Sequence, residues 1–389
     1  GSMGSDSIDD WGRNHSIESD PIAQLDAAFE SAVRRHVPSG ERHGVLLSGG
    51  RDSRLLSGYV VERGDTLDAL TFGRKSDYEV IAAKRVAREL DLEHRVVALD
   101  EARLTEDAEI QSRWEHLAMG FSNLHMWGAV EPLGALPRRV VCGHGLETRA
   151  GEPLPPDFDA MMDLRKHRGI PRATLRRLLR PEKFDGVQES VEQELRESYM
   201  SNSDDERQRG WRFYLDHDWR SHAGGVPWKL TFGAWPIVPI CDREVMNVIA
   251  AMPESSIADR AAHDEIMRRR FPRLARLPLD RNNHDMLPLS PSPISQIKEG
   301  MMGTLRKRMS DGRERRYYHR VYDINGPGWR AVRQMAEPHR GRLSDLFDMK
   351  VVNELVPAPE TFIEVENNVR DTFGTKLLLG LMIWRTSCA

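Results

Sequence analysis

The stretch HGVLLSGGRDSRLLSGYV, residues 43–60, joins an apolar run, a Ser-Gly-Gly turn and a second apolar run. The run before Ser48 predicts a short buried strand, and the run after Asp52 predicts a helix. Gly49 and Gly50 let the backbone approach a bound anion closely, and the N–H groups of the first helical turn attract negative charge. The stretch therefore predicts a phosphate-binding loop between a strand and a helix.

Polar side chains in this loop indicate how the phosphate would be held. Ser48 and Ser53 supply hydroxyl donors. Asp52 would repel a phosphate unless a cation lay between them, so we interpret it as a Mg²⁺ ligand. Arg51 and Arg54 either help to hold the anion or face solvent. The alternative is a glycine turn capped by serine and aspartate, but the SGGxDS spacing between a strand and a helix favours the phosphate site.

Strand and helix patterns alternate through the first part of the chain. Short apolar runs at 66–73, 93–100 and 138–145 predict further strands, and residues 77–92 predict an amphipathic helix. This alternation is typical of βαβ units on a parallel sheet. We therefore expect an α/β fold, with a twisted parallel sheet flanked by helices and a mostly helical C-terminal part.

The pattern also divides the chain into four parts. Residues 1–20 are expected to hold a tag scar and a disordered N-terminus. Residues 21–155 are expected to form the α/β core that carries the loop. Residues 156–295 are expected to be a helical continuation with a proline-rich substrate loop, and residues 296–389 a helical C-terminal region.

Charge and cysteine content narrow the class of protein. The 389 residues include 56 basic and 60 acidic ones, a formal net charge of −4. This balance argues against a nucleic-acid partner, and the lack of a long apolar run argues against a membrane. The three cysteines have no metal-ligand spacing and are too few for a disulfide framework, so we expect a reducing, cytoplasmic compartment.

Four segments together resemble a known family. SGGRDS resembles the SGGxDS loop of the N-type ATP pyrophosphatases, or PP-loop superfamily. Residues 70–99 resemble the second βαβ segment of the synthetase domain of asparagine synthetase and β-lactam synthetase. CGHGLETRAGE (142–152) resembles that family's SGEGADELFGG segment, and residues 235–253 its RxPFLD segment. Order and spacing agree over about residues 20–285, which implies an adenine nucleotide alpha hydrolase-like fold.

The resemblance implies an enzyme that uses ATP and Mg²⁺ to adenylate a carboxylate, releases pyrophosphate and passes the acyl group to an amine. Pyrophosphate leaves with much of the developing charge, so such a site needs cations and backbone donors. The implied partners are a small-molecule or peptide carboxylate and an amine, with a separate ammonia source or carrier protein as a further candidate.

The resemblance also assigns roles to individual residues. His144 falls near the reacting centre, where it would act as the base for the amine or only shape the pocket. Glu147 falls at the second metal-binding position, with a surface glutamate as the alternative. Asp242 is expected to cap a helix. The residues expected to bind ATP are Ser48, Gly49, Gly50, Asp52, Ser53, Thr71, Phe72, Gly143 and Gly145.

Three features depart from the family pattern. Trp235 stands where the family has a glutamate, and Asn283 where it has the lysine that stabilises the adenylation transition state. Arg281 is therefore the candidate catalytic cation, with Lys229 as another. No cysteine stands near the N-terminus to serve as a glutaminase nucleophile, so we expect no glutamine hydrolysis.

Three classes of function are compatible with the sequence. The leading one is an amide-bond-forming ligase that works without a glutaminase. The second is a tRNA- or base-modifying PP-loop enzyme, supported by the arginine-rich residues 165–180 and opposed by the lack of zinc-type cysteine pairs. The third is a degenerate, non-catalytic nucleotide-binding homologue, supported by the missing lysine and by Trp235 in place of the family glutamate. ATP–pyrophosphate exchange separates the third from the others.

Overall fold

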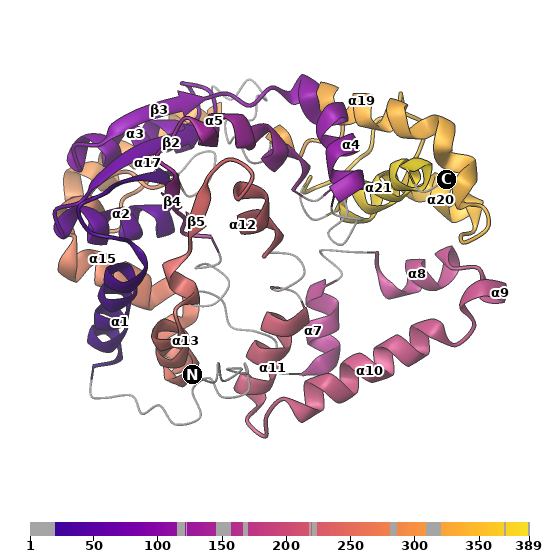
Figure 1. Ribbon diagram of the computed structural model, residues 1–389, viewed down its shortest axis with the longest axis horizontal. Helices are drawn as coiled ribbons and strands as arrows, with labels where there is room; N and C mark the ends of the chain where they lie inside the picture. The colour runs from indigo at the N-terminus through magenta and orange to yellow at the C-terminus, as the bar shows by residue number, and fades with distance from the viewer. Residues whose placement is uncertain are drawn as a thin grey trace. The chain divides into compact units, whose positions relative to one another are not determined.

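The chain forms two compact units, each assembled from separated segments (Figure 1). Unit 1 comprises Gly1–Leu99, Val130–Pro153 and Pro227–Tyr317, and unit 2 the remaining segments. The computed structural model describes residues 20–387 except 115–120, 122, 145–156, 166–169, 218, 220–223, 281–285, 309–319 and 369–370. The units interleave along the sequence, so the sequential division into four parts stays a prediction.

Unit 1 contains a parallel sheet, which confirms the predicted α/β class. In the described residues the sheet has five strands in the order β3-β2-β1-β4-β5. Val45 of β1 lies opposite Ala69 of β2 and Val141 of β4, all three buried. The strands are β1 Arg42–Leu46, β2 Thr66–Phe72, β3 Glu93–Val97, β4 Arg139–Val141 and β5 Trp235–Ile237.

Helices flank this sheet and connect its parallel strands. Helix α2 follows β1 and α3 follows β2, as the alternating pattern predicts. Helix α1 buries Leu25, Phe29 and Val33, a spacing of four residues that lines one helix face. The described helices wholly within unit 1 are α1 Pro21–His36, α2 Asp52–Glu62, α3 Tyr78–Glu89, α5 Val130–Gly134, α13 Arg243–Ala251, α14 Glu254–Ile257, α15 Ala261–Arg270, α16 Pro272–Ala275 and α17 Pro293–Arg308.

Unit 2 is helical in its described residues, apart from an isolated bridge between Leu179 and Phe347. Helix α4 packs against α19 and α21, and α10 packs against α11. The predicted helical C-terminal part is confirmed. The α-helices described in this unit are α4 Leu104–Trp114, α7 Phe158–Arg165, α8 Arg172–Leu178, α9 Pro181–Phe184, α10 Val187–Ser201, α11 Glu206–Tyr214, α19 Pro327–Ala336, α20 Met349–Leu355 and α21 Phe373–Ser387.

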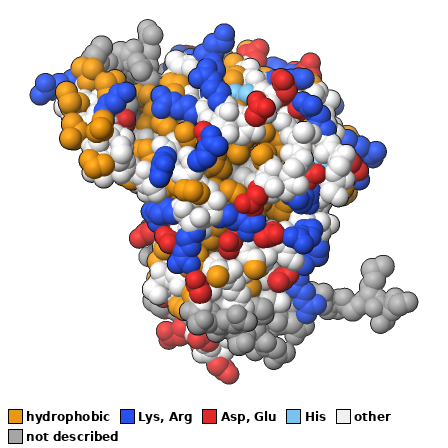
Figure 2. All heavy atoms as spheres, turned by 90° about the vertical axis from the view of Figure 1, so that its left-hand side faces the viewer, with side chains coloured by type: hydrophobic (Ala, Val, Ile, Leu, Met, Phe, Trp, Pro, Cys, Tyr) orange, Lys and Arg blue, Asp and Glu red, His pale blue; other side chains and the backbone are white. Residues whose placement is uncertain are grey.

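Charged side chains of both signs intermix over the face of the molecule in Figure 2. No large area of a single sign dominates this face, in keeping with the near-balance of acidic and basic residues. Among the described residues, each helix is too short or too polar to cross a membrane.

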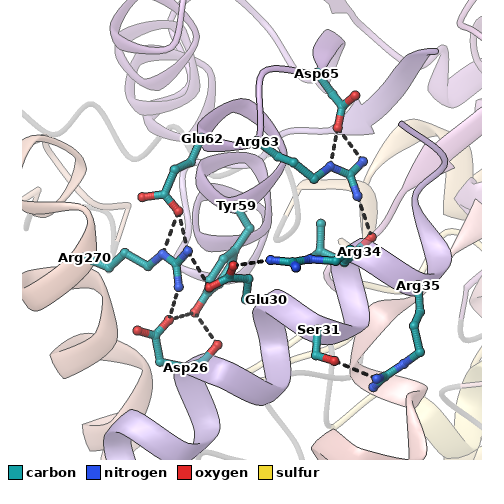
Figure 3. Close-up of polar contacts among 11 residues, drawn as sticks. Asp26, Glu30, Ser31, Arg34, Arg35, Tyr59, Glu62, Arg63, Asp65 and Arg270 are labelled. Carbon is teal, nitrogen blue, oxygen red and sulfur yellow. Dashed lines mark hydrogen bonds and ion pairs between the residues drawn. The ribbon is translucent and has the colours of Figure 1, made fainter. Parts of the chain in front are cut away.

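Arg270, at the end of α15, joins α15 to α1 and α2 (Figure 3). Its guanidinium lies 3.0 Å from Asp26 and 2.8 Å from Glu30 on α1, and it donates to Glu62 on α2 at 2.7 Å. It also lies 4.8 Å from the centre of the Tyr59 ring, whose hydroxyl donates to Asp26. This cluster fixes the far end of the helix that starts in the glycine loop.

Replacing Arg270 with glutamine should leave three carboxylates facing one another around a half-buried position. We expect the free energy of unfolding to fall by about 2 kcal/mol, measured by urea denaturation. Arg34→Gln is the matched control, because Arg34 contacts Glu30 in an exposed i,i+4 pair worth about 0.5 kcal/mol or less. Equal losses for the two variants would show that the cluster has no special role.

Candidate active site

The loop between β1 and α2 is closed by hydrogen bonds among its own residues. The Ser48 N–H donates to the Ser53 hydroxyl at 2.9 Å, and the two hydroxyl oxygens lie 3.0 Å apart. The Gly50 N–H donates to the Ser48 hydroxyl at 3.2 Å. Within the described residues, Arg51 takes the N-cap position of α2 without a side-chain cap hydrogen bond. This arrangement suits a helix N-terminus that receives an anion.

Two glycines are required here by close backbone packing. A Cβ atom on Gly49 would lie 2.9 Å from the Cβ of Asp280 and 3.0 Å from that of Ala82. A Cβ atom on Gly143 would lie 3.0 Å from the Cβ of Asp52. Gly143 follows β4, so its segment lies directly against the first turn of α2. The structure thereby brings the 142–144 segment, with His144, to the loop.

Arg54 stabilises the loop through hydrogen bonds to backbone carbonyl oxygens, a role that the sequence did not predict. Its side chain is fully buried, so both expectations for it, an anion contact and a solvent-facing position, are wrong. Burial, together with the nearby charge of Arg51, lowers the pKa of Arg54 to about 10, which leaves it charged at neutral pH. Its guanidinium donates to the carbonyl oxygens of Gly49, Leu274, Leu277 and Pro278.

Arg51 also forms an ion pair within the protein. It donates to both carboxylate oxygens of Asp264 on α15, at 2.6 and 3.2 Å. The neighbouring His263 is fully buried, and burial together with the charges of Arg260 and Arg51 lowers its pKa to about 3. Its ring is therefore neutral at neutral pH, packed 5.7 Å from the ring of Phe29.

Arg260 contacts Asp52, and sequence reasoning missed it. The Nη1 atom of Arg260 lies 3.4 Å from each carboxylate oxygen of Asp52. Asp259 and Arg260 both have left-handed backbone, with φ of 53° and 63°. Such a conformation costs a residue other than glycine about 1 kcal/mol. Residues 258–262 read ADRAA and carry no motif, so the sequence held no signal for this contact.

Asp52 is the predicted metal ligand that the structure describes. In the described residues no three His, Cys, Asp or Glu side chains gather into a metal cluster. Mg²⁺ bound with a nucleotide needs only one or two carboxylates together with phosphate oxygens. Asp52, at the first turn of α2 and about one-fifth exposed, fits that limited demand. The second predicted ligand, Glu147, lies outside the described residues, as do Gly145 and the candidate catalytic Arg281.

Thr71 and Phe72 end the neighbouring strand β2. The Thr71 hydroxyl is buried, donates to the Leu47 carbonyl at 2.6 Å and lies 2.8 Å from His94 Nε2. Thr71 therefore ties the carboxyl ends of β1 and β2 together. The predicted contact of Thr71 and Phe72 with ATP stays a prediction.

Asp242 caps a helix, as predicted. It accepts the Glu244 N–H at 2.9 Å at the start of α13 and also contacts the side chains of Arg35 and His36 on α1. Burial alone would raise the pKa of Asp242, but the hydrogen bonds from Arg35 and His36 outweigh it and lower the pKa. Lys229, the other candidate cation, is fully buried near the end of the helix α12, Gly225–Leu230.

A comparison with protein families finds one match, to the family described as asparagine synthase, over residues 24–123. This segment includes β1, the glycine loop, α2, β2, α3 and β3, so the match confirms the resemblance where the loop lies. It supports an ATP-dependent ligase family. A comparison with curated proteins gave no match. The resemblance of residues 142–152 and 235–253 rests on the sequence alone.

Proposed function

We propose that this chain is an ATP-dependent, AMP-forming amide-bond synthetase. The proposal starts from the asparagine synthase match over residues 24–123, which supports an ATP-dependent ligase family. One structural observation carries it further. The SGGRDS loop lies where β1 leaves the sheet, and Gly143, after the neighbouring strand β4, packs on Asp52. Ligands of open parallel sheets bind at this edge, outside the carboxyl ends of the strands.

In this proposal the loop backbone binds the phosphates of ATP. The N–H groups of Gly49, of Gly50 and of the first turn of α2 would face the pyrophosphate, where the helix dipole favours negative charge. The Gly50 N–H would then exchange the Ser48 hydroxyl for a phosphate oxygen. Asp52 would hold Mg²⁺, which supplies neutralisation of phosphate charge when bound. The buried Arg54 stabilises the loop but does not contact the ligand in this proposal, because its guanidinium donates hydrogen bonds to carbonyl oxygens.

His144 is the proposed base for the attacking amine. The amine must lose a proton as it attacks the acyl group, and a neutral imidazole can accept that proton. Support comes from the packing of the preceding Gly143 on Asp52, which places residue 144 beside the loop. Its side chain is half-buried.

The substrates belong to the same proposal. They are a small-molecule or peptide carboxylate and an amine, with ammonia or an acyl carrier delivered by another protein as a variant. No glutamine hydrolysis is proposed for this chain. A cytoplasmic location is proposed from the sequence, whose three cysteines have no metal-ligand spacing and are too few for a disulfide framework.

Asp52→Asn should strongly reduce carboxylate-dependent ATP–pyrophosphate exchange, because a neutral amide oxygen is a much weaker Mg²⁺ ligand than a carboxylate. We expect a loss of at least about a hundredfold, with the free energy of unfolding changed by about 0.5 kcal/mol or less. Asp68→Asn, which removes a carboxylate paired with Arg42 near the start of β2, is the control and should keep the activity. Exchange would be screened against amino acids and peptides. A wild-type protein without exchange for any of them would favour a non-catalytic homologue.

His144→Gln should separate the two half-reactions. Exchange should survive, because adenylation removes no proton from an amine, whereas amide formation should fall by about a hundredfold. Both rates would be measured on one preparation, by isotope exchange and by mass spectrometry of the product. An equal loss in the exchange rate and in the rate of amide formation would mean that His144 acts in nucleotide binding or adenylation and not as the base for the amine.

A further inference from the structure

Three arginines lie around the first turn of α2, and they differ in their partners. Arg54 is buried and donates to backbone carbonyl oxygens, and Arg51 donates to Asp264 at 2.6 Å. Arg260 instead contacts Asp52, the carboxylate that is proposed to hold the metal of Mg²⁺-ATP. Of these three cations, Arg260 is therefore the one whose partner must change when nucleotide binds.

The contact between Arg260 and Asp52 is close but loose. Both oxygens of Asp52 lie 3.4 Å from the Nη1 atom, whereas a charge-assisted hydrogen bond has a length of about 2.7–2.9 Å. About a quarter of the Arg260 side chain is exposed. The guanidinium is thus held near the loop without being locked to a single acceptor.

The backbone directs Arg260 towards the loop at an energetic cost. Two consecutive residues, Asp259 and Arg260, adopt the left-handed conformation that favours glycine. Strain of this kind persists where the surrounding structure imposes it, and it clusters at sites of function. Helix α15 begins at the next residue, Ala261, so the turn fixes where the side chain of Arg260 starts.

We propose that Arg260 binds the phosphates of ATP and supplies the cation that the sequence lacks at Asn283. The inference rests on the proposed function, because it takes the glycine loop as the phosphate site. A cation held by Asp52 would weaken the attraction between that carboxylate and Arg260, since like charges repel. Phosphate oxygens bound on the adjacent loop would offer Arg260 another anionic partner, and a guanidinium matches their geometry well.

The test is the affinity of the 389-residue chain for α,β-methylene-ATP, an analogue that cannot release pyrophosphate. Isothermal titration calorimetry with Mg²⁺ should show that Arg260→Gln weakens binding about tenfold, or about 1.4 kcal/mol. Arg260→Lys should recover part of the loss. The matched control is Arg268→Gln, which removes the same charge from α15 where the side chain contacts Glu265. It should bind within about twofold of wild type.

Two further variants separate a phosphate contact from a structural role. In an Asp52→Asn background, Arg260→Gln should still weaken binding about tenfold, because the lost contact is to the nucleotide. Arg260→Gly removes the side chain and relieves the left-handed strain, so it should weaken binding while raising the midpoint of thermal unfolding by about 2 °C.

Unchanged or tighter binding by Arg260→Gln would overturn the inference, because it would mean that Arg260 only competes for Asp52. Loss of the effect in the Asp52→Asn background would overturn it too, because Arg260 would then act only by positioning Asp52. In both cases wild type still binds the analogue, and the proposed function stands. If wild type itself does not bind the analogue, the proposed function fails and the inference fails with it.

Discussion

The candidate site depends on the buried guanidinium of Arg54. It lies beneath the glycine turn and donates to carbonyl oxygens on both sides, those of Gly49 in the loop and of Leu274, Leu277 and Pro278 beyond α15. A buried charge is tolerated only when such partners surround it. The Asp280 N–H adds a bond to the Gly49 carbonyl at 3.1 Å. The loop is therefore held in part by residues more than two hundred positions away in the sequence.

Helix α15 makes the second connection to the loop, through charges. Arg51 reaches Asp264 on α15, and Arg260 reaches back from the residue before α15 to Asp52. The two ion pairs join the same two segments. The segment with Arg51 and Asp52 contributes one cation and one anion, and so does the segment with Arg260 and Asp264. At the other end of α15, Arg270 binds α1 and α2. Both ends of the helix that starts in the glycine loop are thus tied to α15.

Structural features that depend on local sequence patterns could be predicted from the sequence. The strand, glycine turn and helix at residues 43–60 are local, and so is the N-cap at Asp242, which depends on an N–H two residues away. The roles of Arg54 and Arg260 were not predictable, because their partners are distant in sequence and no pattern names them. In the sequence, Arg54 is one of three charged residues in a short loop, and nothing there marks it as buried. Its burial in the structure indicates a structural role. The roles of Arg281, Glu147 and Gly145 stay predictions, since these residues lie outside those described.

A crystal structure of the chain with Mg²⁺ and α,β-methylene-ATP would show whether the Ser48–Ser53 loop binds the phosphates of ATP. We expect the terminal phosphates on the N–H groups of Gly49, Gly50 and the first turn of α2, with the metal on Asp52. A nucleotide bound elsewhere while this loop stays empty would contradict this expectation.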